Sequence, residues 1–166
     1  YFVTFVTKDR EPWLDTQTAR ESVLTVWREW HLEGDGVVLA VVVMPDHVHV
    51  LFRIGAKLTI GRCVSRWKSQ ALKATGYLGK WQRDFWEHRI RSGDSIEDYG
   101  LYMFLNPYRA GLISSGSSWP GWWLPNAAAF KFASALDHDG GPPMEWLNFS
   151  AERFERLALG ESAERA

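Results

Sequence analysis

The stretch VVVMPDHVHVLFRI, residues 41–54, predicts a β-hairpin that carries two histidines beside its turn. Apolar, β-branched residues lead up to Pro45-Asp46, a pair typical of turns, and a second strand-like run begins at His47. Because alternate side chains of a strand share a face, His47 and His49 project together while Val48 points to the opposite face. The sequence thus predicts two imidazoles side by side on one face of a sheet.

Helical and strand-like patterns alternate on both sides of this hairpin. Apolar residues recur at helical spacing between Thr16 and Glu33 and again after Thr59, which can cap the second helix. The order strand, helix, strand, strand, helix, strand favours an α+β fold, in which an antiparallel sheet is covered by helices on one face. The other expected elements are a strand over residues 1–7, an extended segment over 81–91, and a helix that opens with a capping box at Asp94 and Glu97 and is ended or kinked by Pro107.

The length of 166 residues suits one domain followed by a tail. From Ala135 onward the chain has seven acidic and three basic residues, and a Gly-Gly-Pro-Pro segment interrupts it at residues 140–143. We therefore expect a main domain over residues 1–133 and an acidic tail over residues 134–166, with a short helix around residues 151–159.

Composition restricts the compartment. No apolar run is long enough to cross a membrane, since the one that begins at Val37 stops at Pro45. A single cysteine, Cys63, excludes an internal disulfide framework and fits a reducing environment. With no secretory signal recognised ahead of the first strand, we expect a soluble, cytoplasmic protein without a membrane partner.

The net charge of −1 hides a basic segment. Between Arg53 and Arg91 there are ten lysines or arginines and two acidic residues, and aromatic residues such as Trp67 and Tyr77 lie among them. Such a mixture suits phosphate contacts and base stacking, although a solvated helix face would also look basic. The basic residues that we expect to contact DNA are Arg62, Arg66, Lys73, Arg83, Arg89 and Arg91.

The two histidines have two interpretations. Neighbouring imidazoles can converge on one metal ion, with each nitrogen about 2.1 Å from it. They can equally be an ordinary pair of hydrogen-bonded histidines. A metal site built on His47 and His49 needs at least one further donor from elsewhere in the chain.

The stretch YGLYMFLNPYRAGL, residues 99–112, contains candidates for further site residues. On a helix, Tyr102 and Asn106 are four residues apart and share a face. A tyrosine hydroxyl can act as a covalent nucleophile, and an asparagine oxygen can bind a metal or orient a phosphate. By residue type alone, Tyr99 and Tyr108 are rival nucleophiles, and Tyr102 could instead belong to the core.

Four segments together resemble the HUH single-tyrosine transposases, in particular the REP-associated tyrosine transposases of bacteria. The histidine-hydrophobic-histidine signature of that superfamily matches His47-Val48-His49, and in the family the nucleophilic tyrosine precedes the Asn-Pro asparagine by four positions. The resemblance covers about residues 1–125. Its segments, in the family's order, are YFVTFVTKDREPWL (1–14), MPDHVHVLF (44–52), WQRDFWEHRIR (81–91) and YMFLNPYRAGL (102–112).

This resemblance implies a ferredoxin-like or RRM-like α+β fold and a metal-dependent enzyme that cleaves and rejoins single-stranded DNA near a hairpin. It implies Tyr102 as the nucleophile of a covalent 5′-phosphotyrosine intermediate, and His47, His49 and Asn106 as ligands of Mg²⁺ or Mn²⁺. Two other functions stay open: a catalytically silent protein that binds DNA hairpins, and a metal phosphohydrolase for small substrates. The sequence is compatible with a monomer or a homodimer.

Overall fold

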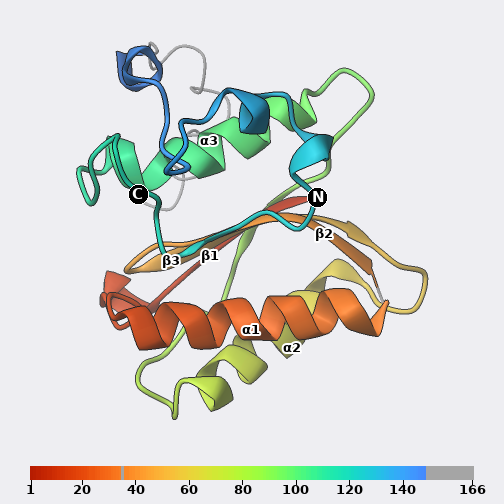
Figure 1. The fold of residues 1–166 in the computed structure, drawn as a ribbon. Coiled ribbons are helices and arrows are strands. Elements are labelled where there is room, and N and C mark those ends of the chain that lie inside the picture. Colours follow the sequence, from red (N-terminus) through yellow and green to blue (C-terminus); the bar gives the residue numbers. More distant parts are fainter. Residues whose placement is uncertain (35, 149–166) are drawn as a thin grey trace. The chain divides into compact units, whose positions relative to one another are not determined.

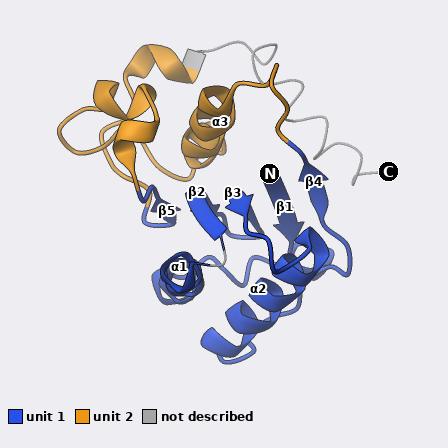
Figure 2. Ribbon diagram, turned by 90° about the vertical axis from the view of Figure 1, so that its right-hand side faces the viewer, with its two compact units in different colours: residues 1–89, 120–125 blue, residues 90–119, 126–166 orange. Residues whose placement is uncertain are grey.

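The computed structural model describes residues 1–34 and 36–148. They form two compact units, shown in blue and orange in Figure 2. The tail helix expected around residues 151–159 lies outside the described residues, and the division of the chain after residue 133 stays a prediction. Unit 1 comprises residues 1–89 and 120–125, and unit 2 comprises residues 90–119 and the described residues from 126 onward.

Unit 1 is built on an antiparallel sheet of five strands in the order β4-β1-β3-β2-β5. All of its strand pairs are antiparallel, and the central strands are the first strand and the predicted hairpin. The predicted α+β architecture is therefore confirmed. The strands are β1 (Phe2–Val6), β2 (Gly36–Val43), β3 (His47–Ile54), β4 (Trp86–His88) and β5 (Trp122–Trp123).

Two helices, α1 (Gln17–Glu33) and α2 (Ile60–Ala74), cover the same face of this sheet (Figure 1). Thr59 caps α2 as expected, and Thr16 caps α1 in the same way, because each hydroxyl accepts a hydrogen bond from a backbone N–H three residues later. Gly34 ends α1 with a φ of +73°, a backbone conformation that favours glycine. A short 3₁₀ helix, η1 (Lys8–Arg10), follows β1.

The core of unit 1 lies between the sheet and these helices. Val48, Val50 and Phe52 alternate along β3 into this core, where they meet large buried aromatic side chains. Trp27 of α1 and Trp67 of α2 pack with ring centroids 4.0 Å apart. Burial of each such side chain contributes roughly 1.5–3 kcal/mol. The alternation places His47 and His49 on the opposite face of the sheet, away from the two helices.

Unit 2 contains the helix α3 (Ile96–Arg109), whose start differs from the predicted capping box. The cap is Ser95, whose hydroxyl accepts a hydrogen bond from the Asp98 N–H. The Asp94 carboxylate instead accepts from the Arg91 N–H, and the Glu97 carboxylate accepts from the N–H groups of Lys131 and Phe132. The predicted roles of Asp94 and Glu97 are wrong, because a serine one position later takes the cap.

Of the two outcomes expected at Pro107, an end of the helix is wrong, since α3 does not stop at Asn106. Pro107 lies inside it, and the helix continues to Arg109. Proline forfeits one backbone hydrogen bond, but the last turn is closed by the N–H of Ala110 donating to the carbonyl of Asn106. Gly111, with a φ of +70°, follows the C-cap. The described residues of the unit also form three short 3₁₀ helices: η2 (Ala127–Ala129), η3 (Phe132–Ala135) and η4 (Met144–Asn148).

Among the described residues, no helix combines the length and the apolar character needed to cross a membrane.

Candidate functional site

The two histidines stand at the start of β3, directly after the Pro45-Asp46 turn. Their Nε2 atoms are 3.1 Å apart, and their ring centroids are 4.6 Å apart. The side chain of His47 is 12% exposed, whereas His49 is fully buried. The predicted pairing of the imidazoles on one face of the sheet is confirmed.

The other ring nitrogen of each histidine has its own hydrogen-bond partner. His47 Nδ1 lies 2.5 Å from Asp46 Oδ1, and His49 Nδ1 lies 2.8 Å from the hydroxyl of Thr4. Thr4 is the residue of β1 directly opposite His49 in the sheet register. These two contacts turn both Nε2 atoms toward the same point, the arrangement that metal-binding histidines adopt with outer partners on their second nitrogen.

Asp46 is itself held in place. Arg10 donates a hydrogen bond to its second oxygen, Oδ2, at 3.0 Å. Burial raises the pKa of Asp46, but the hydrogen bonds and charges of His47 and Arg10 outweigh this effect and lower the pKa to about 2. Asp46 is therefore a carboxylate at neutral pH and can accept a hydrogen bond from His47 Nδ1.

The spacing of the Nε2 atoms fits one metal ion. Two nitrogens 3.1 Å apart that each lie about 2.1 Å from an ion subtend about 95° at it, close to the angle between adjacent ligands of an octahedron. Two donors do not complete a site, and no cluster of three His, Cys, Asp or Glu side chains able to hold a metal occurs in residues 1–34 and 36–148. An amide oxygen such as that of Asn106 is a donor of another type. Asn106 lies on α3 in unit 2 and is half-buried.

The three tyrosines of α3 are all buried, with exposed fractions of 6% for Tyr99, 4% for Tyr102 and 6% for Tyr108. The hydroxyl of Tyr108 donates to the carbonyl of Ser117 at 2.7 Å. Burial, with a smaller contribution from the charge of Asp137, raises the pKa of Tyr108 to about 12 against the opposing effect of a hydrogen bond with the Trp119 backbone. A phenol so difficult to ionise is a poor nucleophile, which leaves Tyr99 and Tyr102.

The six basic residues predicted to contact DNA differ in their surroundings. On α2, Arg62 and Lys73 are exposed, but Arg66 is half-buried and its Nη2 lies 2.6 Å from a carboxylate oxygen of Glu33 on α1. This ion pair competes with any phosphate for Arg66. Arg83 and Arg89, near β4 in unit 1, and Arg91 in unit 2 are exposed.

The family model for IS200-like transposases matches residues 1–93, more than half of the chain. The chain belongs to this family. Its sequence is 30% identical to the REP-associated tyrosine transposase of Escherichia coli (strain K12), over 72% of this chain and 73% of the relative. It is 24% identical to a putative REP-associated tyrosine transposase of Haemophilus influenzae, over 72% of this chain and 76% of the relative.

The fold is also that of a solved relative. A structure of a REP-associated tyrosine transposase bound to a REP hairpin matches with a TM-score of 0.58 and 26% identity, over 73% of each chain. The IS200-like family model ends just after β4, so it contains the histidine pair and the basic segment but not α3. The family resemblance predicted from the sequence is confirmed.

Within this transposase fold, one lysine has a role that sequence reasoning missed. Lys68 of α2 donates through Nζ to the backbone carbonyls of Gln82 and Asp84, each at 2.8 Å, and to that of Arg83 at 3.3 Å. It thereby fixes the segment that leads into β4 and carries Arg83. Nothing in the local sequence separates Lys68 from the other basic residues of its helix, since the contact spans more than a dozen positions.

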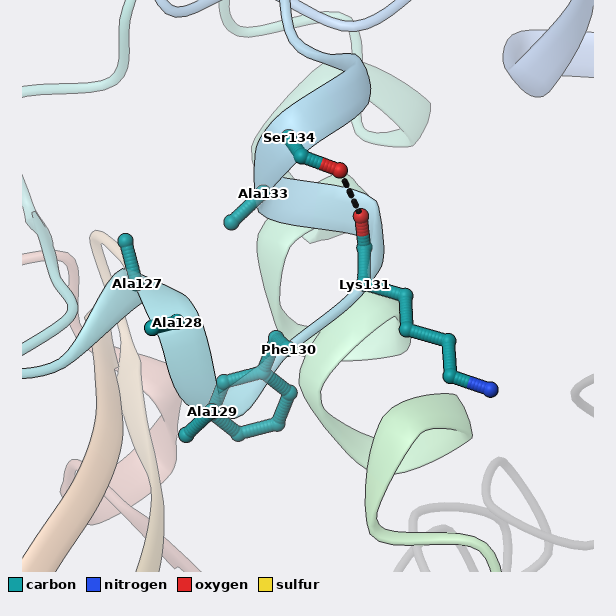
Figure 3. Close-up of a pocket in the computed structure, with 7 residues that line it drawn as sticks. All are labelled: Ala127, Ala128, Ala129, Phe130, Lys131, Ala133 and Ser134. Carbon is teal, nitrogen blue, oxygen red and sulfur yellow. Dashed lines mark hydrogen bonds between the residues drawn. The ribbon is translucent and has the colours of Figure 1, made fainter.

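A surface hollow of about 460 Å³ lies in unit 2 (Figure 3). Its walls are mainly methyl groups of alanines, with Phe130 and the side chain of Lys131 beside them, and Ser134 donates to the Lys131 carbonyl. None of the predicted site residues lines it. Its alanines offer no group that could act on a phosphodiester.

Proposed function

We propose that this protein cleaves and rejoins single-stranded DNA near hairpins through a covalent 5′-phosphotyrosine on Tyr102. We further propose that His47, His49 and Asn106 hold a divalent ion, Mg²⁺ or Mn²⁺. Membership of a transposase family supports a reaction on DNA. That a solved relative is bound to a REP hairpin supports hairpin DNA as the partner of this chain.

The observation that carries the proposal is the orientation of the two imidazoles. Their Nδ1 atoms are bonded to Thr4 and Asp46, and their Nε2 atoms are 3.1 Å apart. Any buried pair of histidines needs hydrogen-bond partners, but here the partners hold both Nδ1 atoms and leave both Nε2 atoms facing one point. The same arrangement orients two imidazoles as neighbouring ligands of one ion.

The residues have distinct roles in the proposed reaction. A divalent ion bound there would supply positive charge beside the scissile phosphate and so offset the charge of the transition state. The Tyr102 oxygen attacks phosphorus and loses its proton to solvent, while the bond from phosphorus to the 3′-oxygen breaks. That oxygen takes up a proton and leaves as a free 3′-hydroxyl, and the 5′-phosphate stays on tyrosine. Attack by a 3′-hydroxyl on this linkage reverses the step and rejoins a strand.

The residues concerned belong to different units. His47 and His49 are in unit 1, whereas Tyr102 and Asn106 are in unit 2. Cleavage therefore requires one scissile phosphate to reach side chains of both units. Because Tyr102 is 4% exposed, it also requires the phenol oxygen to become accessible when DNA binds.

Among the tyrosines of α3, Tyr102 is preferred for two reasons. It lies one helical turn before Asn106, so the two side chains share a face of the helix. Tyr108 is disfavoured by its hydrogen bond to Ser117 and its raised pKa. Tyr99 is a turn further from Asn106, and its exclusion rests on the family resemblance.

Formation of a protein–DNA adduct tests this function directly. A labelled single-stranded hairpin is incubated with Mn²⁺ and the protein, and the products are separated on a denaturing gel. We expect a slow-migrating adduct for wild type, Tyr99→Phe and Tyr108→Phe, and none for Tyr102→Phe or when EDTA removes the metal. Hairpin binding without an adduct in wild type would favour the silent binding protein. Cleavage of small phosphate esters without an adduct would favour the phosphohydrolase.

A further inference from the structure

The proton positions in the histidine pair follow from the chemistry of its partners. An ionised carboxylate only accepts hydrogen bonds, so the short contact of Asp46 with His47 Nδ1 requires the proton to be on that nitrogen. In the neutral ring, His47 Nε2 then carries a lone pair and acts as an acceptor. The hydrogen bond from Arg10 to the second oxygen of Asp46 keeps this arrangement in place.

His49 must adapt to that acceptor. Its Nε2 lies 3.1 Å from His47 Nε2. Without an ion between them, one of the two nitrogens has to carry a proton, because otherwise two lone pairs would face each other. Without metal, the proton of His49 therefore sits on Nε2 and is donated to His47. The Nδ1 atom of His49 is then an acceptor, and the Thr4 hydroxyl, 2.8 Å away, donates to it.

Metal binding reverses the direction of the hydrogen bond between Thr4 and His49. An ion held by both Nε2 atoms needs a lone pair on each, so the proton of His49 must leave Nε2 and reside on Nδ1. The Thr4 hydroxyl then accepts the hydrogen bond that it previously donated. His49 stays neutral throughout, because one proton is lost from Nε2 and one is gained at Nδ1 by exchange with solvent.

We infer that Thr4 is a positioning residue whose hydroxyl lets His49 change tautomer when the ion binds, while Asp46 holds His47 in one tautomer in both states. A hydroxyl suits this position because it is a donor and an acceptor at once, unlike a carboxylate or an ammonium group. His49 is fully buried and Thr4 is 3% exposed, so this partner is built into the structure. The inference rests on the metal part of the proposed function.

Imidazole nitrogen chemical shifts report the tautomers directly. Uniformly ¹⁵N-labelled protein is measured at pH 8 by long-range ¹H–¹⁵N correlation, first without metal and then with Zn²⁺, a diamagnetic probe that binds imidazole. We expect His47 to carry its proton on Nδ1 in both spectra. We expect His49 to carry its proton on Nε2 without metal and on Nδ1 with Zn²⁺. A His49 protonated on Nδ1 in both spectra would overturn the inference, as would a His47 protonated on both nitrogens.

Substitutions at Thr4 test the consequence for affinity. Thr4→Val keeps the shape but removes the hydrogen bond to His49 Nδ1 in both states. The loss is larger with metal, because a bound ion polarises the imidazole and makes its Nδ1–H the stronger donor, so Mn²⁺ binding, followed by the EPR signal of free Mn²⁺, should weaken about 10- to 100-fold. Thr4→Ser keeps a hydroxyl and should restore most of the affinity. Thr75→Val is the matched control, because it removes a buried hydroxyl that donates to the Ala71 carbonyl on α2.

Circular dichroism confirms that each variant is folded. Equal Mn²⁺ affinity in Thr4→Val and wild type would overturn the inference, as would an equal loss in Thr4→Val and Thr75→Val. The outcomes for the two proposals are separable. A wild type in which Zn²⁺ switches His49 but which forms no DNA adduct would support the switch and refute the proposed chemistry. If wild type forms the adduct but His49 keeps the same tautomer, the proposed chemistry is supported and the tautomer switch is refuted.

Discussion

The histidine pair on β3 and the tyrosines on α3 both contribute residues to the proposed reaction, but their surroundings prepare them differently. Around His47 and His49, the contacts of Asp46 and Thr4 already turn the reactive nitrogens toward one point. The tyrosines of α3 are buried, and the hydroxyl of Tyr108 donates to a backbone carbonyl. For the proposed reaction, the histidine nitrogens are thus oriented in advance, whereas the phenol of Tyr102 would have to become accessible to DNA.

The largest effect is expected from removing a ligand of the organised half. His49→Ala should weaken Mn²⁺ binding more than about a hundredfold, since loss of an outer partner alone costs up to that much. Because His49 is buried, its removal can also lower stability, and His47→Ala tests the same claim at a more exposed position. Calorimetric titration with Mn²⁺ measures both.

His88→Ala is the matched control for these two variants. His88 is half-buried on β4, where its ring stacks on Trp86 with a centroid separation of 6.2 Å. Its Mn²⁺ affinity should equal that of wild type. Equal affinities in wild type and in both His47→Ala and His49→Ala would show that the pair is an ordinary hydrogen-bonded one.

A moderate effect is expected on α2, where exposed and paired cations can be compared. Arg62 and Lys73 are exposed, while Arg66 is engaged by Glu33. Each phosphate contact to single-stranded DNA changes the slope of log affinity against log salt by about 0.7. Arg62→Gln combined with Lys73→Gln should therefore flatten the slope by about 1.4. Adding Arg66→Gln should flatten it by less than a further ~0.7, because Glu33 already pairs with this arginine. Anisotropy titrations over a range of salt concentrations measure this, and an unchanged slope would mean that this face is only solvated.

The smallest effect is expected on the free energy of unfolding at alkaline pH, which tests the raised pKa of Tyr108 on α3. Tyr108 ionises near pH 10 when unfolded and at about 12 when folded, so the stability linked to it is present below pH 10 and is lost as pH rises toward 12. Tyr108→Phe should remove this part of the alkaline loss, on the order of 1–3 kcal/mol. Urea unfolding between pH 9 and pH 12 measures it. The exposed Tyr77→Phe is the control, and parallel pH profiles for wild type and Tyr108→Phe would refute the assignment.

The features that could be predicted from the sequence are those set by residues within a few positions of one another along the chain. The strands, the hairpin and the Thr59 cap of α2 follow from side-chain alternation, turn chemistry and a hydroxyl three residues from its partner. The convergence of His47 and His49 is of this kind, since a strand of period two places them together. For the same reason the sheet and its helices agree with expectation.

The features that were predicted wrongly or missed depend on residues far apart along the chain, or on neighbouring residues that compete for one role. Ser95 displaced Asp94 as the cap of α3, and Glu97 was recruited by backbone N–H groups more than thirty residues away. The ion pair of Arg66 with Glu33 likewise joins two helices. The role of Thr4 could have been found only from the register of β1 against β3, which pairs Thr4 with His49.

The central claim is that Tyr102 becomes covalently joined to DNA, and the site of attachment tests it most directly. No lysine or arginine interrupts the chain between Arg91 and Arg109, so trypsin leaves all three tyrosines of α3 on one peptide, Ser92–Arg109. The adduct formed with Mn²⁺ and a hairpin is trimmed by nuclease and trypsin, and the peptide is fragmented in a mass spectrometer. We expect the nucleotide mass on Tyr102. Its presence on Tyr99 or Tyr108 instead would contradict the account.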